Sequence, residues 1–107
     1  MTTKNGIESG LKKRVLLVDD EARVRASLKA VLEPNYEVIQ AADAQEGLDL
    51  FHKEAPHVVL LDVILPGTDG LSVLQTLRTE QNTTPVIMLT GTKSVKTAVD
   101  AMKAGRS

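Results

Sequence analysis

Hydrophobic and polar residues alternate along the chain in blocks, with four short apolar runs that are each followed by a longer, mixed stretch. The runs are dominated by Val, Leu and Ile, a composition typical of strands that are buried on both faces of a parallel sheet. They predict strands at Arg14–Val18, Tyr36–Ala41, His57–Asp62 and Val86–Thr90.

In the stretches after these runs, apolar residues recur three or four positions apart, which is the spacing of one helix face. The residues predicted to face inward are Val24, Leu28, Val31 and Leu32, then Leu48, Phe51 and Ala55, then Leu71, Leu74 and Leu77, and last Val95, Val99 and Met102. Asp43 is predicted to cap the second helix and Pro56 to end it. Strand and helix therefore alternate four times, which predicts one α/β domain with helices on both faces of a parallel sheet.

Composition adds little to this picture, but it excludes several classes of protein. A net charge of −1 over 107 residues provides no basic excess, so no nucleic-acid partner is expected. The absence of cysteine excludes disulfides and thiolate metal sites and fits a reducing compartment. No apolar run approaches the roughly 20 residues of a membrane span, so no membrane partner is expected. Residues 1–13 lack the apolar stretch of a signal peptide and are predicted to form a flexible tail on a cytoplasmic protein.

Polar side chains stand where three of the four predicted strands end. Asp19 and Asp20 follow the first strand, Asp62 ends the third, and Thr90 ends the fourth. In open α/β sheets, ligands bind beyond the carboxyl ends of the strands. Carboxylates that converge there repel one another unless a cation neutralises them, and hard oxygen ligands suit Mg²⁺. The strand ends therefore predict a receptor for a phosphoryl group and its metal.

Each of these residues also has a simpler interpretation. A single Asp after a strand most often caps the next helix, and Asp69 and Gly70 could be ordinary turn residues. Arg23, Arg25 and Lys29 make the first helix basic on one side, which is most often a solvated face. What capping does not explain is the combination of acids on two strand ends with a Thr on a third, and that combination favours a site.

Three motifs, read together and in order, resemble the receiver domains of two-component response regulators. The motifs are VDDE at 18–21, DVILPGTDG at 62–70 and PVIMLTG at 85–91, and SVKTAVDAMKAG at 94–105 looks like the fourth helix of that family. The resemblance implies a flavodoxin-like, doubly wound sheet. It also implies that residues 14–107 form a receiver domain of four strand–helix units, truncated before the family's fifth strand and helix.

The resemblance assigns roles to six residues and implies Mg²⁺ as the cofactor. Asp62 would accept a phosphoryl group from a histidine kinase or phosphotransfer protein, as one step of a phosphorelay. The other implied roles are direct Mg²⁺ binding by Asp20, binding mainly through water by Asp19, a backbone carbonyl ligand from Ile64, a hydrogen bond to the phosphoryl group from Thr90, and space beside it at Gly91. By this resemblance, the module would at most phosphorylate itself from a donor and would not be an enzyme with turnover. The first helix of such domains commonly docks the kinase.

The sequence departs from the family where the fifth strand would carry a lysine. Lys93 is in the loop after Thr90, and a solvent-exposed lysine is the favoured interpretation. An uncovered fourth strand and fourth helix would favour a homodimer that buries Val86, Met88, Val95 and Val99.

Two alternatives to a phosphoacceptor stay open. One is a receiver-like interaction or dimerisation protein whose phosphorylation-dependent switching is impaired. The other is a phosphatase like the haloacid dehalogenases, which expects two acids separated by one residue, whereas Asp19 and Asp20 are adjacent.

Overall fold

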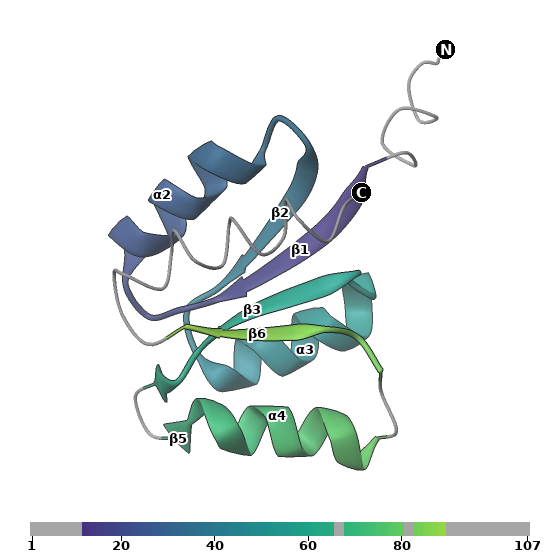
Figure 1. The fold of residues 1–107 in the computed structure, drawn as a ribbon. Coiled ribbons are helices and arrows are strands. Elements are labelled where there is room, and N and C mark those ends of the chain that lie inside the picture. The colour runs from purple at the N-terminus through teal and green to yellow at the C-terminus, as the bar shows by residue number, and fades with distance from the viewer. Residues whose placement is uncertain (1–11, 66–67, 81–82, 90–107) are drawn as a thin grey trace.

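A four-stranded parallel sheet lies at the centre of the protein in the computed structural model, which describes residues 12–65, 68–80 and 83–89 (Figure 1). Its strands, in spatial order, are β2 (Tyr36–Ala41), β1 (Lys13–Val18), β3 (Val58–Asp62) and β6 (Val86–Leu89). All three neighbouring pairs run parallel. This order is the flavodoxin-like one, so the predicted fold class is confirmed.

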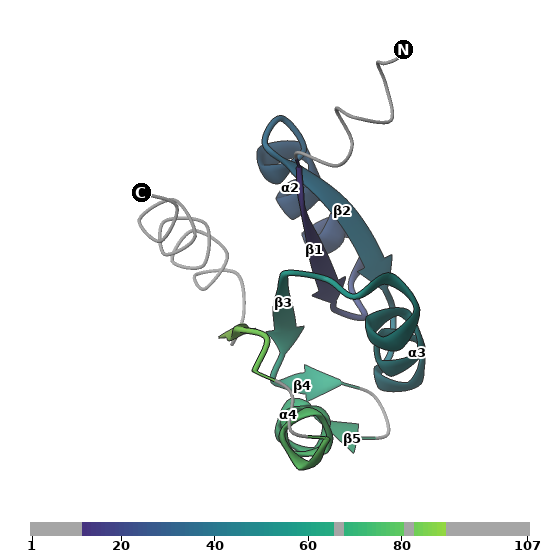
Figure 2. The ribbon, with the colours of Figure 1, turned by 90° about the vertical axis from the view of Figure 1, so that its right-hand side faces the viewer.

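Within the described residues, three helices cover the two faces of the sheet. On one face lies α2 (Ala22–Leu32), and on the other lie α3 (Ala44–Glu54) and α4 (Gly70–Thr79), as Figures 1 and 2 show. A short antiparallel ribbon of β4 (Ile64–Leu65) and β5 (Thr68–Asp69), which the sequence pattern did not predict, connects β3 to α4. None of the described helices is long and apolar enough to cross a bilayer.

Strand β1 is buried on both faces of the sheet, which accounts for its continuous run of apolar residues. Val15 and Leu17 pack with Leu28 and Leu32 of α2 on one face of the sheet. Leu16 and Val18 pack on the other face, in the cluster that contains Phe51 of α3 and Val73 and Leu77 of α4. Because successive side chains of a strand point to opposite faces, a strand that is covered on both sides needs apolar residues at every position.

The local signals at the ends of α3 act as predicted. The Asp43 side chain accepts a hydrogen bond from the Glu46 amide at 2.8 Å and caps the helix. The helix ends at Glu54, and Ala55 takes the left-handed conformation with φ 48° before Pro56. The prediction that Ala55 faces inward is therefore wrong, because this residue lies beyond the helix and is exposed.

Two further residues that were predicted to face inward are exposed. Val31 of α2 is 48% exposed and Leu71 of α4 is 54% exposed. In α2, Leu28 and Leu32 form the buried row, and Val31 lies at its edge. In α4, the most buried side chains are Val73 and Leu77, spaced four residues apart. The buried face is therefore rotated about the helix axis relative to the predicted one, which included Leu71.

Several predictions concern residues outside the described ranges. These residues are Thr90, Gly91, Lys93 and the whole fourth helix with Val95, Val99 and Met102. Residues 1–11 of the predicted tail lie outside as well, whereas Lys13 already belongs to β1. Of the residues assigned to a homodimer interface, Val86 and Met88 are half-buried in β6, and the homodimer stays a prediction.

Candidate functional site

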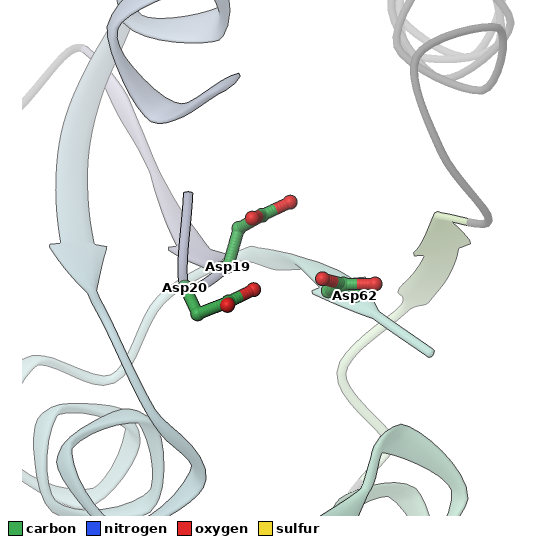
Figure 3. A group of neighbouring side chains, drawn as sticks. All are labelled: Asp19, Asp20 and Asp62. Atoms are coloured by element: carbon green, nitrogen blue, oxygen red, sulfur yellow. The ribbon is translucent and has the colours of Figure 1, made fainter. Parts of the chain in front are cut away.

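Three carboxylates meet at the carboxyl edge of the sheet. Asp19 and Asp20 follow the last residue of β1, and Asp62 is the last residue of β3. The two strands are direct neighbours, with Val18 opposite Leu61, so their ends lie side by side. One carboxylate oxygen from each residue lies within 4.8 Å of the others, and Figure 3 shows the carboxylates of Asp19 and Asp20 directed toward the side of Asp62. We call these three residues the aspartate cluster.

The members of the aspartate cluster differ in exposure. Asp19 is only 5% exposed, Asp62 is half-buried and Asp20 is exposed. The side chain of Asp19 also accepts a hydrogen bond from the Glu21 amide at 2.8 Å, which orients the carboxylate. The cluster is thus anchored on its buried member and open to solvent at Asp20.

Burial raises the pKa of Asp19 above its ordinary value of 3.8. The hydrogen bond from the Glu21 amide opposes this shift, while the negative charges of Asp62, Asp20 and Glu21 add to it. A buried carboxylate among like charges is less stable in its ionised form. A bound cation would reverse this effect, which is the electrostatic reason to regard the cluster as a cation site.

We expect Asp19→Asn to stabilise the metal-free protein at neutral pH. The raised pKa means that the folded protein binds the Asp19 proton more tightly than the unfolded chain does. The stability of the wild type therefore falls as pH rises from about 3.8 through the folded-state pKa of Asp19. Asn keeps the acceptor for the Glu21 amide without the charge. Thermal unfolding in a chelating buffer should give the variant the higher Tm.

Added Mg²⁺ should then stabilise the wild type more than the variant, because only binding to the folded state raises Tm. Asp49→Asn, which makes the same chemical change at an exposed position of α3, is the control. A variant Tm equal to or below that of the wild type in the chelating buffer would contradict the electrostatic account of Asp19.

The main chain at Asp62 is enclosed by the start of α4. The amide of Gly70 donates to the carbonyl of Val63 at 2.6 Å, and the amide of Val63 donates to the carbonyl of Leu89 at 2.9 Å. A Cβ atom on Gly70 would overlap the carbonyl oxygen of Asp62 and lie 2.8 Å from the Cα of Val63. Gly70, considered above as an ordinary turn residue, is thus the residue that lets α4 pack directly against the end of β3.

Arg25 was interpreted as part of a solvated basic face, and this interpretation is wrong. Arg25 is half-buried, and its guanidinium donates to the main-chain carbonyl of Asp19 at 2.6 Å and to the side chain of Gln40 at 3.1 Å. Arg23 is exposed, and Lys29 lies 3.7 Å from Glu33. The only sequence signal for Arg25 was an arginine in the first turn of a helix that follows two acids.

The aspartate cluster suits a hard divalent cation such as Mg²⁺, which binds one or two carboxylates and fills its other positions with water or phosphate oxygens. Ile64 follows Asp62 by two residues and is paired with Asp69 in the β4–β5 ribbon. Its carbonyl stays a predicted ligand. Thr90 and Gly91, the remaining predicted members of the site, lie outside the described residues.

Comparison of the sequence with known proteins finds similarity to response regulators and transcriptional regulators. The sequence profile of the response regulator receiver domain matches residues 15–107. A probable transcriptional regulator, ycf27, of Guillardia theta is 40% identical over 100 residues, which cover 92% of this chain and 39% of the relative. The response regulator MprA of Mycolicibacterium vanbaalenii is 42% identical over 93 residues, covering 86% of this chain and 40% of that protein.

Solved structures agree with the sequence comparison. The receiver domain of the Francisella response regulator 1452 has a TM-score of 0.71 at 30% identity, covering 88% of this chain and 78% of that one. The receiver domain of the hybrid histidine kinase CckA has a TM-score of 0.73 at 31% identity, covering 85% of this chain and 96% of that one. The chain spans about two fifths of the length of the curated relatives it matches, 39% for the Guillardia protein. By profile, sequence and structure, this chain belongs to the response regulator receiver domain family.

Proposed function

We propose that Asp62 accepts a phosphoryl group from a histidine kinase or phosphotransfer protein, with Mg²⁺ bound by the aspartate cluster and the carbonyl of Ile64. The observation that supports this most strongly is the approach of one carboxylate oxygen from each of Asp19, Asp20 and Asp62 to within 4.8 Å. Membership of the receiver family supports the same role.

The chemistry is a phosphoryl transfer between two nucleophiles. A carboxylate oxygen of Asp62 forms a bond to phosphorus while the bond from phosphorus to the donor breaks, and the product is a mixed anhydride. Such transfers depend on position and on charge stabilisation more than on covalent help from other side chains. Asp62 fits this need because it ends a strand that is paired on both sides, with β1 and with β6.

The other residues of the site serve binding and orientation. When bound, Mg²⁺ would offset the negative charge of the phosphoryl oxygens that a carboxylate must approach. Exposed Asp20 would ligate the ion directly, and buried Asp19 would act mainly through water while its charge lowers the local potential. Thr90 would hydrogen-bond the transferred group, with Gly91 leaving space for it.

The partners and the output follow from the relatives. Because one relative is named a probable transcriptional regulator and is longer than this chain, we propose that the domain is coupled to control of transcription. We expect no nucleic-acid contact from the residues of this chain, because they carry a net charge of −1. This expectation does not extend to other parts of a longer protein. A cytoplasmic location fits a donor that is a histidine kinase or phosphotransfer protein.

We expect the wild-type chain to gain the mass of one phosphoryl group when it is incubated with acetyl phosphate and Mg²⁺. The gain should be absent with a chelator, because the cluster's like charges would then repel the anionic donor. Intact-mass spectrometry measures it. Asp62→Asn should abolish the gain, and Asp49→Asn, which neutralises an exposed acid of α3, should preserve it. An unlabelled wild type under conditions that label another receiver domain would instead favour the interaction protein.

A further inference from the structure

The guanidinium of Arg25 joins two parts of the fold that are distant in sequence. Arg25 lies in the first turn of α2. Its Nη1 donates to the main-chain carbonyl of Asp19 at 2.6 Å, and its Nε donates to Oε1 of Gln40 in β2 at 3.1 Å. Gln40 is paired in register with Leu17 of β1. Arg25 therefore ties the turn after β1 to the neighbouring strand β2.

The carbonyl that Arg25 contacts belongs to the peptide bond between the two acids. A peptide unit is planar, so the oxygen of Asp19 and the amide of Asp20 move together. A donor that fixes the oxygen consequently fixes the backbone rotation that precedes Asp20, and with it the position of the Asp20 Cα atom from which the side chain starts. Arg25 thus acts on the exposed member of the aspartate cluster through the main chain.

Two further bonds of the turn contact Asp19 through its amide and its side chain. The amide of Asp19 donates to the carbonyl of Ala41 at 3.1 Å, and the Asp19 side chain accepts from the amide of Glu21 at 2.8 Å. Neither bond involves the carbonyl of Asp19. A charged donor makes a stronger hydrogen bond than a neutral one, and the planar fork of arginine can serve two acceptors at fixed angles.

We infer that Arg25 is a positioning residue for the cation site, holding the peptide between Asp19 and Asp20 so that both carboxylates face Asp62. Repulsion within the cluster would otherwise move exposed Asp20 toward solvent. The bonds described for Arg25 end on a carbonyl and an amide oxygen, so it orients the acids without neutralising them. This inference rests on the proposed function for its consequence in Mg²⁺ binding, but the positioning itself concerns the metal-free protein.

The first readout is amide hydrogen exchange in the metal-free protein. Arg25→Ala should accelerate exchange at the Glu21 amide by about 10-fold or more, the factor expected from loss of a charge-assisted hydrogen bond. Arg23→Ala removes the same charge from an exposed position of the same helix and should leave this exchange unchanged. Equal exchange in Arg25→Ala, Arg23→Ala and the wild type would overturn the inference, whether or not the protein binds Mg²⁺.

The second readout is Mg²⁺ affinity, followed by amide chemical shifts in NMR titrations that also report folding. Loss of a residue that only orients metal ligands typically costs about 10- to 100-fold in affinity, so the Kd of Arg25→Ala should rise by about 10-fold. Saturating Mg²⁺ should restore most of the phosphorylation rate. Arg25→Lys, which can serve one acceptor but not both at the same angles, should recover part of the affinity.

These outcomes separate the inference from the proposed function. A wild type that binds no Mg²⁺ contradicts the proposed function, whereas a wild type and a folded Arg25→Ala with equal Kd contradict the inference. If Arg25→Ala does not fold, Gln40→Ala removes only the β2 end of the bridge and should still raise the Kd and the exchange rate at Glu21. Wild-type values for Gln40→Ala would then overturn the inference.

Discussion

Replacing Gly70 by Ala is expected to lower the free energy of unfolding by about 3 kcal/mol, the upper part of the range for inserting atoms into a closely packed site. The added Cβ would overlap the carbonyl oxygen of Asp62 and lie 2.8 Å from the Cα of Val63. Both atoms belong to the backbone, which cannot rotate away as a side chain can. The loss is expected although Ala favours a helix over Gly by roughly 1 kcal/mol. Chemical denaturation of the purified variant measures it.

The same substitution should also slow phosphorylation, because relief of the overlap moves the end of β3 or the start of α4. A displacement near 1 Å at a reacting group can cost on the order of 100-fold in rate. Gly47→Ala is the matched control, since the atoms nearest its Cβ would belong to the side chain of Val18, at 3.0 and 3.1 Å, and not to the backbone. Its loss of stability should be clearly smaller. Equal stability of Gly70→Ala and the wild type would show that α4 does not pack against Asp62 as described.

Replacing Asp20 by Asn is expected to raise the Kd for Mg²⁺ by about 10- to 100-fold or more. Loss of a residue that only hydrogen-bonds to a metal ligand already weakens metal binding by this factor, and Asp20 is proposed as a direct ligand. Asn offers a carbonyl oxygen of similar shape without the charge, so the loss reflects charge more than size. Isothermal calorimetry of the folded variant gives the Kd.

The control for Asp20→Asn is Glu21→Gln, which removes the same charge from the next residue. Glu21 is exposed, and its amide rather than its side chain contacts Asp19. The Kd for Mg²⁺ should then rise only slightly, because exposed charges are well screened at ordinary salt. Similar Kd values for the two variants would mean that the site attracts Mg²⁺ by general charge, without ligation by Asp20.

The strands could be predicted closely because their burial leaves a signal at every residue. β2 spans Tyr36–Ala41 as predicted, and β3 differs by one residue at its start. The helix faces were harder to predict because a helix buries only part of its circumference. Leu71 is as apolar as Leu77, yet only Leu77 is buried, and the choice depends on how α4 lies against the sheet.

The meeting of the carboxylates could be anticipated from the rule that parallel strands end at one edge of the sheet. The residues that hold them could not. The contact of Arg25 with Asp19 depends on how α2 turns back over β1, and the bond to Gln40 joins residues 15 positions apart. The need for glycine at position 70 follows from its approach to Asp62, eight residues earlier, which no spacing rule describes.

The most direct test of the account is to locate the phosphoryl group on the chain. Borohydride reduces an aspartyl phosphate to homoserine, which peptide mass spectrometry identifies by position. After treatment of the wild type with acetyl phosphate and Mg²⁺, the account predicts homoserine at position 62 and unmodified aspartate at positions 19 and 20. Homoserine at position 19 or 20 with aspartate intact at position 62, or no homoserine in a protein that has bound Mg²⁺, would contradict it.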